Sequence, residues 1–345
     1  MIPLCALLLV QGAEARQPIP ARFEGYSLAV VSDPDPRQPP RQDPKYRWEY
    51  PFVVRAYLGV GGEEGLRFVV HAQTARTYPT ALLAARQLLR MIEYAHAHLG
   101  YDNPLAYGRR VDVFLSEGGK PGGEQGVFEG PDESGRLRSF NCIYIYDLDS
   151  FREPLEMARE VAHEFGHVVI PPIGGFEKPE RWANGALGER IFLSYLSSSE
   201  IPNEDRMGAP AEGLKAWVAT NVSALADDVF LRGPDQDLVA GKAVPMDSYL
   251  ALMLMFYEAL PEAFGPATRL AGGTTARDAH NGILKAVDER ALWNVAVPER
   301  LRSQAIYLPA PGEWAVEGGK PLARKGAWMK VQPLASVVTL TKREE

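Results

Sequence analysis

The chain has 345 residues, of which 46% are hydrophobic and 23% are charged. This composition is typical of a globular protein, and the length allows one large domain or two lobes. The formal net charge is −7 and the isoelectric point is near 5.6, which argues against a phosphate backbone as partner and excludes nucleic acid as the expected substrate.

The first 15 residues have the features of a secretory signal peptide. Residues 2–10 are an apolar run, and Ala13-Glu14-Ala15 is a small-residue pattern suited to signal peptidase. We expect cleavage near Ala15 and a secreted or periplasmic protein; a cytosolic protein with a wrongly chosen start codon is the alternative. No other stretch reaches the roughly 18 apolar residues needed for a membrane span. One cysteine, Cys142, would remain after cleavage, so no internal disulfide is expected.

The remaining chain divides into three predicted segments. Residues 16–47 are a proline-rich tether, because proline removes backbone donors and blocks helices and central strands. Residues 48–305 are the main domain, and residues 306–345 are a short C-terminal β segment. Within the main domain, residue composition and hydrophobic periodicity predict strands at 52–60, 66–73, 110–115 and 141–147, a glycine-rich turn at 61–65, a helix at 80–99 and a glycine-rich connection at 118–130.

The second half of the main domain has a different pattern. From residue 182 to about 302 the sequence predicts helices with polar connectors and no strand. We therefore predict an α+β fold, with a small mixed β-sheet lobe at 48–175 and a helical lobe at 176–305. The C-terminal β segment is too short to fold alone and should pack on the main body.

The motif H-E-x-x-H occurs once, as His163-Glu164-Phe165-Gly166-His167. It lies in a predicted helix at 155–170 that ends before two consecutive prolines, at the seam between the two lobes. On a helix, histidines four residues apart share one face, so both imidazoles can bind one Zn²⁺ ion, while Glu164 can take a proton from the bound water. A chance match on a buried helix is the alternative.

A catalytic zinc site usually takes a third protein ligand, and Glu189 is the residue that we predict for this role. It lies within an apolar stripe on a predicted helix that begins near Asn184, where a buried carboxylate needs a partner. That partner is either the zinc ion or an arginine in a salt bridge. Glu177 and Glu180 are weaker candidates, because they lie in a polar stretch that is typical of a solvated loop.

These residues carry a resemblance to a known family. H-E-F-G-H, followed about twenty residues later by a glutamate on a second helix, resembles the gluzincin metallopeptidases, the thermolysin and aminopeptidase-like group. The order of sheet lobe, motif helix and helical lobe is similar too, over roughly residues 80–288. Many relatives read W-x-x-E-G on the second helix, whereas Trp182-Ala183-Asn184-Gly185-Ala186 has glycine where that glutamate would be.

The resemblance implies two further site residues. Aminopeptidase-type gluzincins use a tyrosine on a later helix to stabilise the oxyanion, and Tyr249 is similar in position; a packing role is the alternative. The same enzymes hold the substrate amine with a glutamate on a glycine-rich strand, and Gly122-Gly123-Glu124-Gln125-Gly126 is similar to it, although such runs are commonly turns.

Together these patterns predict an exported zinc metallopeptidase with one Zn²⁺ ion on His163, His167 and Glu189. Glu164 is the expected general base, Tyr249 an oxyanion donor, and a peptide or protein the substrate. The alternative is a peptidase-fold protein without turnover that binds a peptide or glycan, which Gly185 favours. A structural zinc site is a third hypothesis, but His71, His96, His98, His280 and Cys142 have no suggestive spacing, and His280 could instead be an oxyanion donor. The sequence gives no indication of the oligomeric state.

Overall fold

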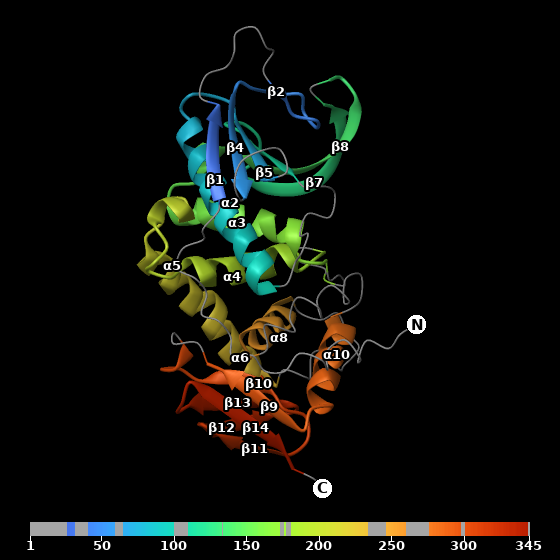
Figure 1. Cartoon of the computed structure of the whole chain (residues 1–345), viewed down its shortest axis with the longest axis vertical. Coiled ribbons are helices and arrows are strands. Elements are labelled where there is room, and N and C mark those ends of the chain that lie inside the picture. The colour runs from blue at the N-terminus through green and yellow to red at the C-terminus, as the bar shows by residue number, and fades with distance from the viewer. Residues whose placement is uncertain are drawn as a thin grey trace.

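The computed structural model describes residues 26–31, 41–58, 65–99, 110–132, 134–172, 176, 181–233, 246–259, 276–297 and 301–343. Three parts follow one another along the long axis of the molecule: a β-sheet, a group of helices and a set of C-terminal strands (Figure 1). The predicted α+β class, with strands at the C-terminus, is confirmed. The predicted signal peptide at 1–15 lies outside the described residues.

A six-stranded mixed sheet forms the first part, with the strand order β1-β4-β5-β6-β8-β7. The pairs β5–β6 and β6–β8 are parallel, while β1–β4, β4–β5 and β7–β8 are antiparallel. Its strands are β1 (Tyr26–Val31), β4 (Phe52–Leu58), β5 (Leu66–Ala72), β6 (Val111–Leu115), β7 (Gly122–Pro131) and β8 (Leu137–Tyr146). A short hairpin of β2 (Arg41–Gln42) and β3 (Glu49–Tyr50) precedes β4. The strands predicted at the positions of β4, β5, β6 and β8 are therefore present.

Two edge strands differ from the sequence prediction. The segment Tyr26–Val31 lies within the predicted tether, yet it forms β1 by pairing along its whole length with β4. The predicted glycine-rich connection contains β7, which pairs with β8 from Gly122 opposite Tyr146 to Pro131 opposite Leu137. In both cases a neighbouring strand supplies the hydrogen-bond partners. The glycine-rich β7 has weak local strand propensity, whereas β1 contains tyrosine and valine residues that favour strands.

Two long helices pack near the sheet, α2 (Tyr78–Leu99) and α3 (Pro154–Val169). The buried side of α2 carries residues at helical spacing, such as Leu88, Leu89 and Ile92. Helix α3 begins with a proline in its first turn, where the missing N–H costs nothing, and it ends just before Pro171 and Pro172. The 3₁₀ turn η2 (Leu148–Ser150) leads into α3.

Helix α4 (Asn184–Leu196) packs on α3 through glycines. A Cβ atom added at Gly188 would lie 2.4 Å from the Cα of Gly166, and one added at Gly166 would lie 2.7 Å from the backbone oxygen of Asn184. The main chains of the two helices therefore meet without side chains between them. This close approach brings the first turn of α4 next to the histidines of α3.

The helical part continues with η3 (Asn203–Arg206), α5 (Ala211–Val218), the π-helical turn η4 (Ala219–Ser223), α6 (Ala224–Arg232), α8 (Met246–Ala259) and α10 (Ala276–Asp288). The turn η3 is fastened to α2 by an ion cluster. Asp205 is fully buried, and its two oxygens each lie 2.6 Å from a guanidinium nitrogen, one of Arg86 and one of Arg90.

The C-terminal strands form two three-stranded antiparallel sheets, β10-β13-β12 and β11-β14-β9. Their strands are β9 (Leu292–Ala296), β10 (Ile306–Pro309), β11 (Trp314–Glu317), β12 (Gly319–Lys325), β13 (Trp328–Pro333) and β14 (Val337–Lys342). Strand β9 lies in the region where the sequence predicts helices only. It is a strand because β14 pairs with it from Leu292 to Ala296. One of the C-terminal sheets therefore includes a strand from the preceding region of the chain.

The helices among the described residues include none that is both long enough and apolar enough to cross a membrane.

Candidate metal centre

Helix α3 holds the candidate metal-binding residues on one face. His163 and His167 lie one turn apart, with ring centroids 5.0 Å from each other, and Glu164 lies beside them with only 4% of its surface exposed. Each of these three residues offers a ligand atom within 4.8 Å of the other two. The i, i+4 spacing predicted this cluster, and the helix places it as expected.

The Nδ1 atom of His167 is held by Asn184, the first residue of α4. The distance from His167 Nδ1 to Asn184 Oδ1 is 2.9 Å, and the amide nitrogen of Asn184 donates to the backbone oxygens of Ile170 (3.1 Å) and His167 (3.4 Å). These two bonds fix which end of the amide is the oxygen. Since an amide oxygen only accepts, His167 donates from Nδ1, and its Nε2 keeps a lone pair that can bind a metal.

The Nδ1 atom of His163 faces a carboxylate. Glu189 Oε2 lies 3.5 Å from it, and the other oxygen of Glu189 accepts a hydrogen bond of 2.7 Å from Nε of Arg159. A metal-binding histidine usually has its second ring nitrogen bonded to such a carboxylate or amide, which orients the ring. The two rings thus have the partners that suit ligation through Nε2.

Gly185 lies where both Nε2 atoms point. A Cβ atom added there would lie 2.3 Å from Nε2 of His167 and 2.6 Å from Nε2 of His163. The Cβ atom of any larger residue would overlap both imidazole rings, so glycine is required if the rings are to keep these positions. The main chain of α4 lies next to the nitrogens, where the family resemblance would place a third ligand side chain.

The position of Glu189 bears on its predicted role as third ligand. Its side chain is 9% exposed and lies on the Nδ1 side of His163, paired with Arg159. Burial raises the pKa of Glu189, but the hydrogen bond with His163 and the charge of Arg159 outweigh burial and hold that pKa below its usual value. The geometry suits an orienting partner of His163, and the salt bridge to an arginine is present. A direct bond from Glu189 to zinc stays a prediction.

The edge strand β7 lies against the acidic side of α3. A Cβ atom added at Gly123 would lie 2.9 Å from Oε1 of Glu164 and 2.8 Å from Oε1 of Glu160, so a larger residue there would require these carboxylates to move. The backbone N–H of Gly123 donates to the Glu160 carboxylate, yet burial raises the pKa of Glu160. The glycine-rich segment therefore lines the site, although as a strand.

Glu124, which the resemblance suggested as an amine-binding residue, has other partners. Its carboxylate accepts a hydrogen bond from the Tyr146 hydroxyl and pairs with Lys45. Because side chains alternate along a strand, Glu124 points away from the face on which Gly123 meets α3. The Glu124 carboxylate therefore pairs with Lys45 and Tyr146 on the face of the sheet opposite α3.

The remaining candidates lie in other surroundings. Tyr249 is 2% exposed on α8, and its ring centroid is 5.4 Å from that of Phe176, so it contributes to the helical core; its role as an oxyanion donor stays a prediction. His71 pairs with Asp112 at 2.8 Å, and Trp328 donates to Nε2 of His280 at 3.3 Å. Glu177 and Glu180 lie outside the described residues. His96 and His98 lie in the last turn of α2. Cys142 lies in strand β8, where burial raises the pKa of its thiol.

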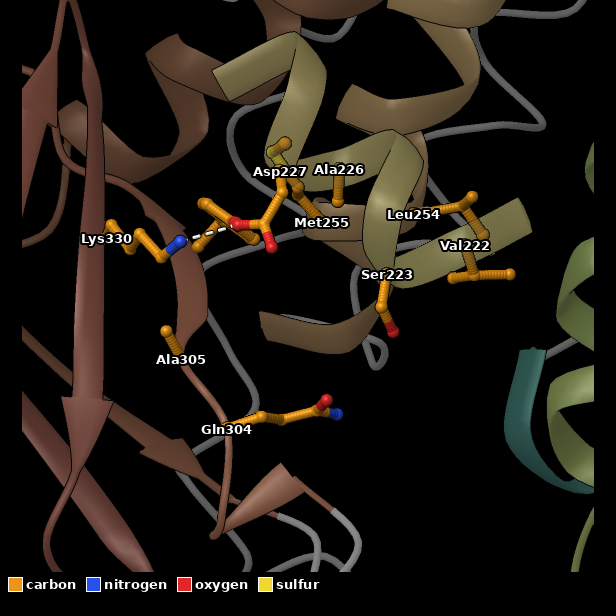
Figure 2. A pocket seen from close by; sticks show the side chains of 10 residues that line it. Val222, Ser223, Ala226, Asp227, Leu254, Met255, Gln304, Ala305 and Lys330 are labelled. Atoms are coloured by element: carbon orange, nitrogen blue, oxygen red, sulfur yellow. Dashed lines mark hydrogen bonds and ion pairs between the residues drawn. The ribbon is translucent and has the colours of Figure 1, made fainter. Parts of the chain in front are cut away.

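A separate cavity of about 140 Å³ lies between the helices and the C-terminal strands (Figure 2). Lys330 Nζ and Asp227 Oδ1 are 2.5 Å apart at its edge, and the same ammonium lies 5.2 Å from the centre of the Tyr307 ring. Its lining comes from η4, α6, α8, β10, β13 and the residues just before β10, not from the helices that hold the histidines.

Three residues of the site were not predicted as site residues from the sequence. Asn184 was expected only as the start of a helix, and Arg159 and Glu160 were not expected at the site at all. For Glu160 and Arg159 the signal is their spacing from His163 on one helix, since Glu160 is three residues and Arg159 four residues before it.

A comparison with protein-family models gave no match, and no curated protein matches the chain.

Proposed function

We propose that the chain is an exported zinc-dependent hydrolase that cleaves peptide bonds. The observation that carries this proposal is the orientation of His163 and His167. Their Nε2 atoms converge, while Asn184 and Glu189 hold their Nδ1 atoms, next to the buried carboxylate of Glu164. Zinc is commonly bound by histidines whose other ring nitrogen is hydrogen-bonded to a protein group, so His163 and His167 fit this metal.

Each protein group has a distinct task in this proposal. His163 and His167 would hold the ion through Nε2. When bound, zinc supplies Lewis acidity, which polarises a carbonyl group and lowers the pKa of a water molecule. Glu164 accepts a proton from the attacking water and passes it to the leaving amine. Burial of Glu164 between α3 and the main chain of β7 fixes the position of its carboxylate.

The wild-type chain, loaded with zinc, should cleave a mixed peptide pool in a chelator-sensitive manner, as followed by mass spectrometry. Glu164→Gln should keep zinc but reduce cleavage by about 10²–10⁴-fold, which is the usual contribution of a general base. Glu212→Gln is the control, because Glu212 is an exposed residue of α5. Undiminished cleavage by Glu164→Gln would remove Glu164 as the base.

A peptide- or glycan-binding protein without turnover is the second candidate function. Gly185 favours it, because this residue supplies no ligand side chain beside the two imidazoles. Retention of peptides by the zinc-loaded chain without any cleavage would support this candidate over the hydrolase.

A further inference from the structure

The cavity between the helices and the C-terminal strands has the size of a site for a very small molecule (Figure 2). Its volume is about 140 Å³, and cavities of about 150 Å³ hold a molecule of the size of benzene. Sites for drug-sized molecules are larger, at about 300–1,000 Å³. The cavity therefore suits a ligand of about six to eight non-hydrogen atoms.

One wall of the cavity is apolar. It is formed by Val222 of η4, Ala226 of α6, and Leu254 and Met255 of α8, and each of these residues is at most 6% exposed. A short aliphatic group placed against this wall would leave water, which favours binding. Small-molecule sites commonly combine such a wall with a few polar groups that orient the ligand.

The polar groups of the cavity include one ion pair. Lys330 Nζ of β13 lies 2.5 Å from Asp227 Oδ1 of α6, and the two side chains are 24% and 52% exposed. An ammonium group has three N–H donors and a carboxylate has two acceptor oxygens, so each group can bind a ligand in addition to its partner. The side chains of Ser223 and Gln304 point toward the same space, and each offers a donor and an acceptor (Figure 2).

The two neighbouring charges favour one class of ligand. A ligand with only a carboxylate would be attracted by Lys330 and repelled by Asp227, and a ligand with only an amine would meet the opposite pair of effects. An α-amino acid carries an ammonium group and a carboxylate on the same carbon atom. It can therefore direct its carboxylate to Lys330 and its ammonium group to Asp227, while its side chain contacts the apolar wall.

The local geometry of the helix beside the cavity is unusual. Val222 and Ser223 are the last two residues of η4, the π-helical turn at Ala219–Ser223. Turns of this kind are rare, and within α-helices they are frequently found at functional sites. Because η4 contributes both residues to the lining, its geometry shapes the cavity.

We propose that this cavity binds a free α-amino acid with a small aliphatic side chain. Lys330 binds the carboxylate, Asp227 binds the ammonium group, and the apolar wall contacts the side chain. The lining comes from other elements than α3 and α4, so this inference goes beyond the proposed hydrolase and does not depend on its metal centre.

NMR titrations of the full chain that detect the ligand signals, with L-valine as the probe, test this inference. Three analogues are compared with L-valine: 3-methylbutanoate lacks the ammonium group, isobutylamine lacks the carboxylate, and glycine lacks the aliphatic side chain. L-Valine should bind about fivefold more tightly than each analogue, or tighter still. The first two analogues lose an ion pair at a partly exposed site, and glycine loses the apolar contact.

Two variants that each remove one charge should change the ligand preference in opposite directions. Lys330→Gln should weaken binding of L-valine and favour isobutylamine over 3-methylbutanoate, because the carboxylate of Asp227 remains. Asp227→Asn should also weaken binding of L-valine, but it should favour 3-methylbutanoate. Lys215→Gln is the matched control, because Lys215 pairs with Glu212 at 2.7 Å on α5 and neither residue lines the cavity. Circular dichroism checks that the variants are folded.

Each outcome supports or overturns the inference. Saturable binding of L-valine that both variants weaken, with opposite changes of preference, would support it. No saturable binding to the wild-type chain, or equal affinities for L-valine and its analogues, would overturn it. Binding that neither variant changes would place the amino acid elsewhere on the chain and would overturn it as well. If a variant fails to fold, the comparison of L-valine with its analogues on the wild-type chain decides. The proposed zinc hydrolase is unaffected by any of these results.

Discussion

The role of Glu189 can be decided by replacing it with glutamine and with alanine. Glutamine keeps one acceptor oxygen for the Nδ1 hydrogen of His163, whereas alanine removes both acceptors. If Glu189 orients His163, as its position 3.5 Å from Nδ1 indicates, the alanine variant should lose zinc affinity and the glutamine variant should lose much less.

The magnitude follows from the contacts. Loss of a group that orients a metal-binding histidine typically lowers metal affinity by about 10–100-fold, which corresponds to about 1.4–2.7 kcal/mol. The bond between Glu189 and Arg159 adds little to stability, because the Arg159 side chain is 42% exposed and exposed ion pairs contribute about 0–1 kcal/mol. The alanine variant should therefore remain folded while it binds zinc more weakly.

The assay is a chelator competition for zinc with wild type, Glu189→Gln, Glu189→Ala and the exposed control Glu212→Gln, and circular dichroism checks folding. Equal and severe losses in both Glu189 variants would identify Glu189 as a direct zinc ligand, since a neutral amide is a poor substitute for a carboxylate on the metal. Unchanged affinity in Glu189→Ala would refute both roles.

Two further predictions concern buried charges elsewhere in the chain. Asp205→Ala should lower the free energy of unfolding by about 3–5 kcal/mol in urea denaturation, because it leaves the Arg90 guanidinium, which is 5% exposed, without its carboxylate; a loss below about 1 kcal/mol would contradict this. In NMR titrations of its ring protons, His71 should titrate below the ordinary histidine pKa of about 6.5, since burial lowers its pKa although Asp112 opposes the shift. A folded pKa below the unfolded value means that the stability contributed by His71 is complete above about pH 6.5. This contribution is lost as the pH falls from there through the folded pKa. A ring that titrates near pH 6.5 would disprove the lowered pKa.

The local sequence pattern was sufficient to predict the helices, because the hydrogen bonds of a helix join residues that are close in sequence. The spacing of apolar residues predicted α2 and α3, and the motif spacing placed His163 and His167 on one face, because the turn of a helix fixes that relation regardless of the rest of the chain. The helix ends were also predictable, since Pro171 and Pro172 prevent α3 from continuing.

Pairing between distant segments was not predictable in this way. Strands β1, β7 and β9 lie in a proline-rich, a glycine-rich and a helix-like region of the sequence, and each is a strand because a neighbour offers a complete row of hydrogen bonds. Strand formation depends on that partner more than on the strand's own residues.

The sequence by itself determined that two histidines lie one turn apart on one helix with a glutamate beside them, which is the arrangement on which the proposed metal site rests. Only the tertiary structure decided which groups surround them. The glycine contact between α3 and α4 sets how closely the helices approach, and this distance puts Asn184 and Glu189 on the Nδ1 atoms and Gly185 against the Nε2 atoms. The physical reason is that a ligand's place on a second helix depends on packing distance and rotation, and no spacing within one helix encodes either quantity.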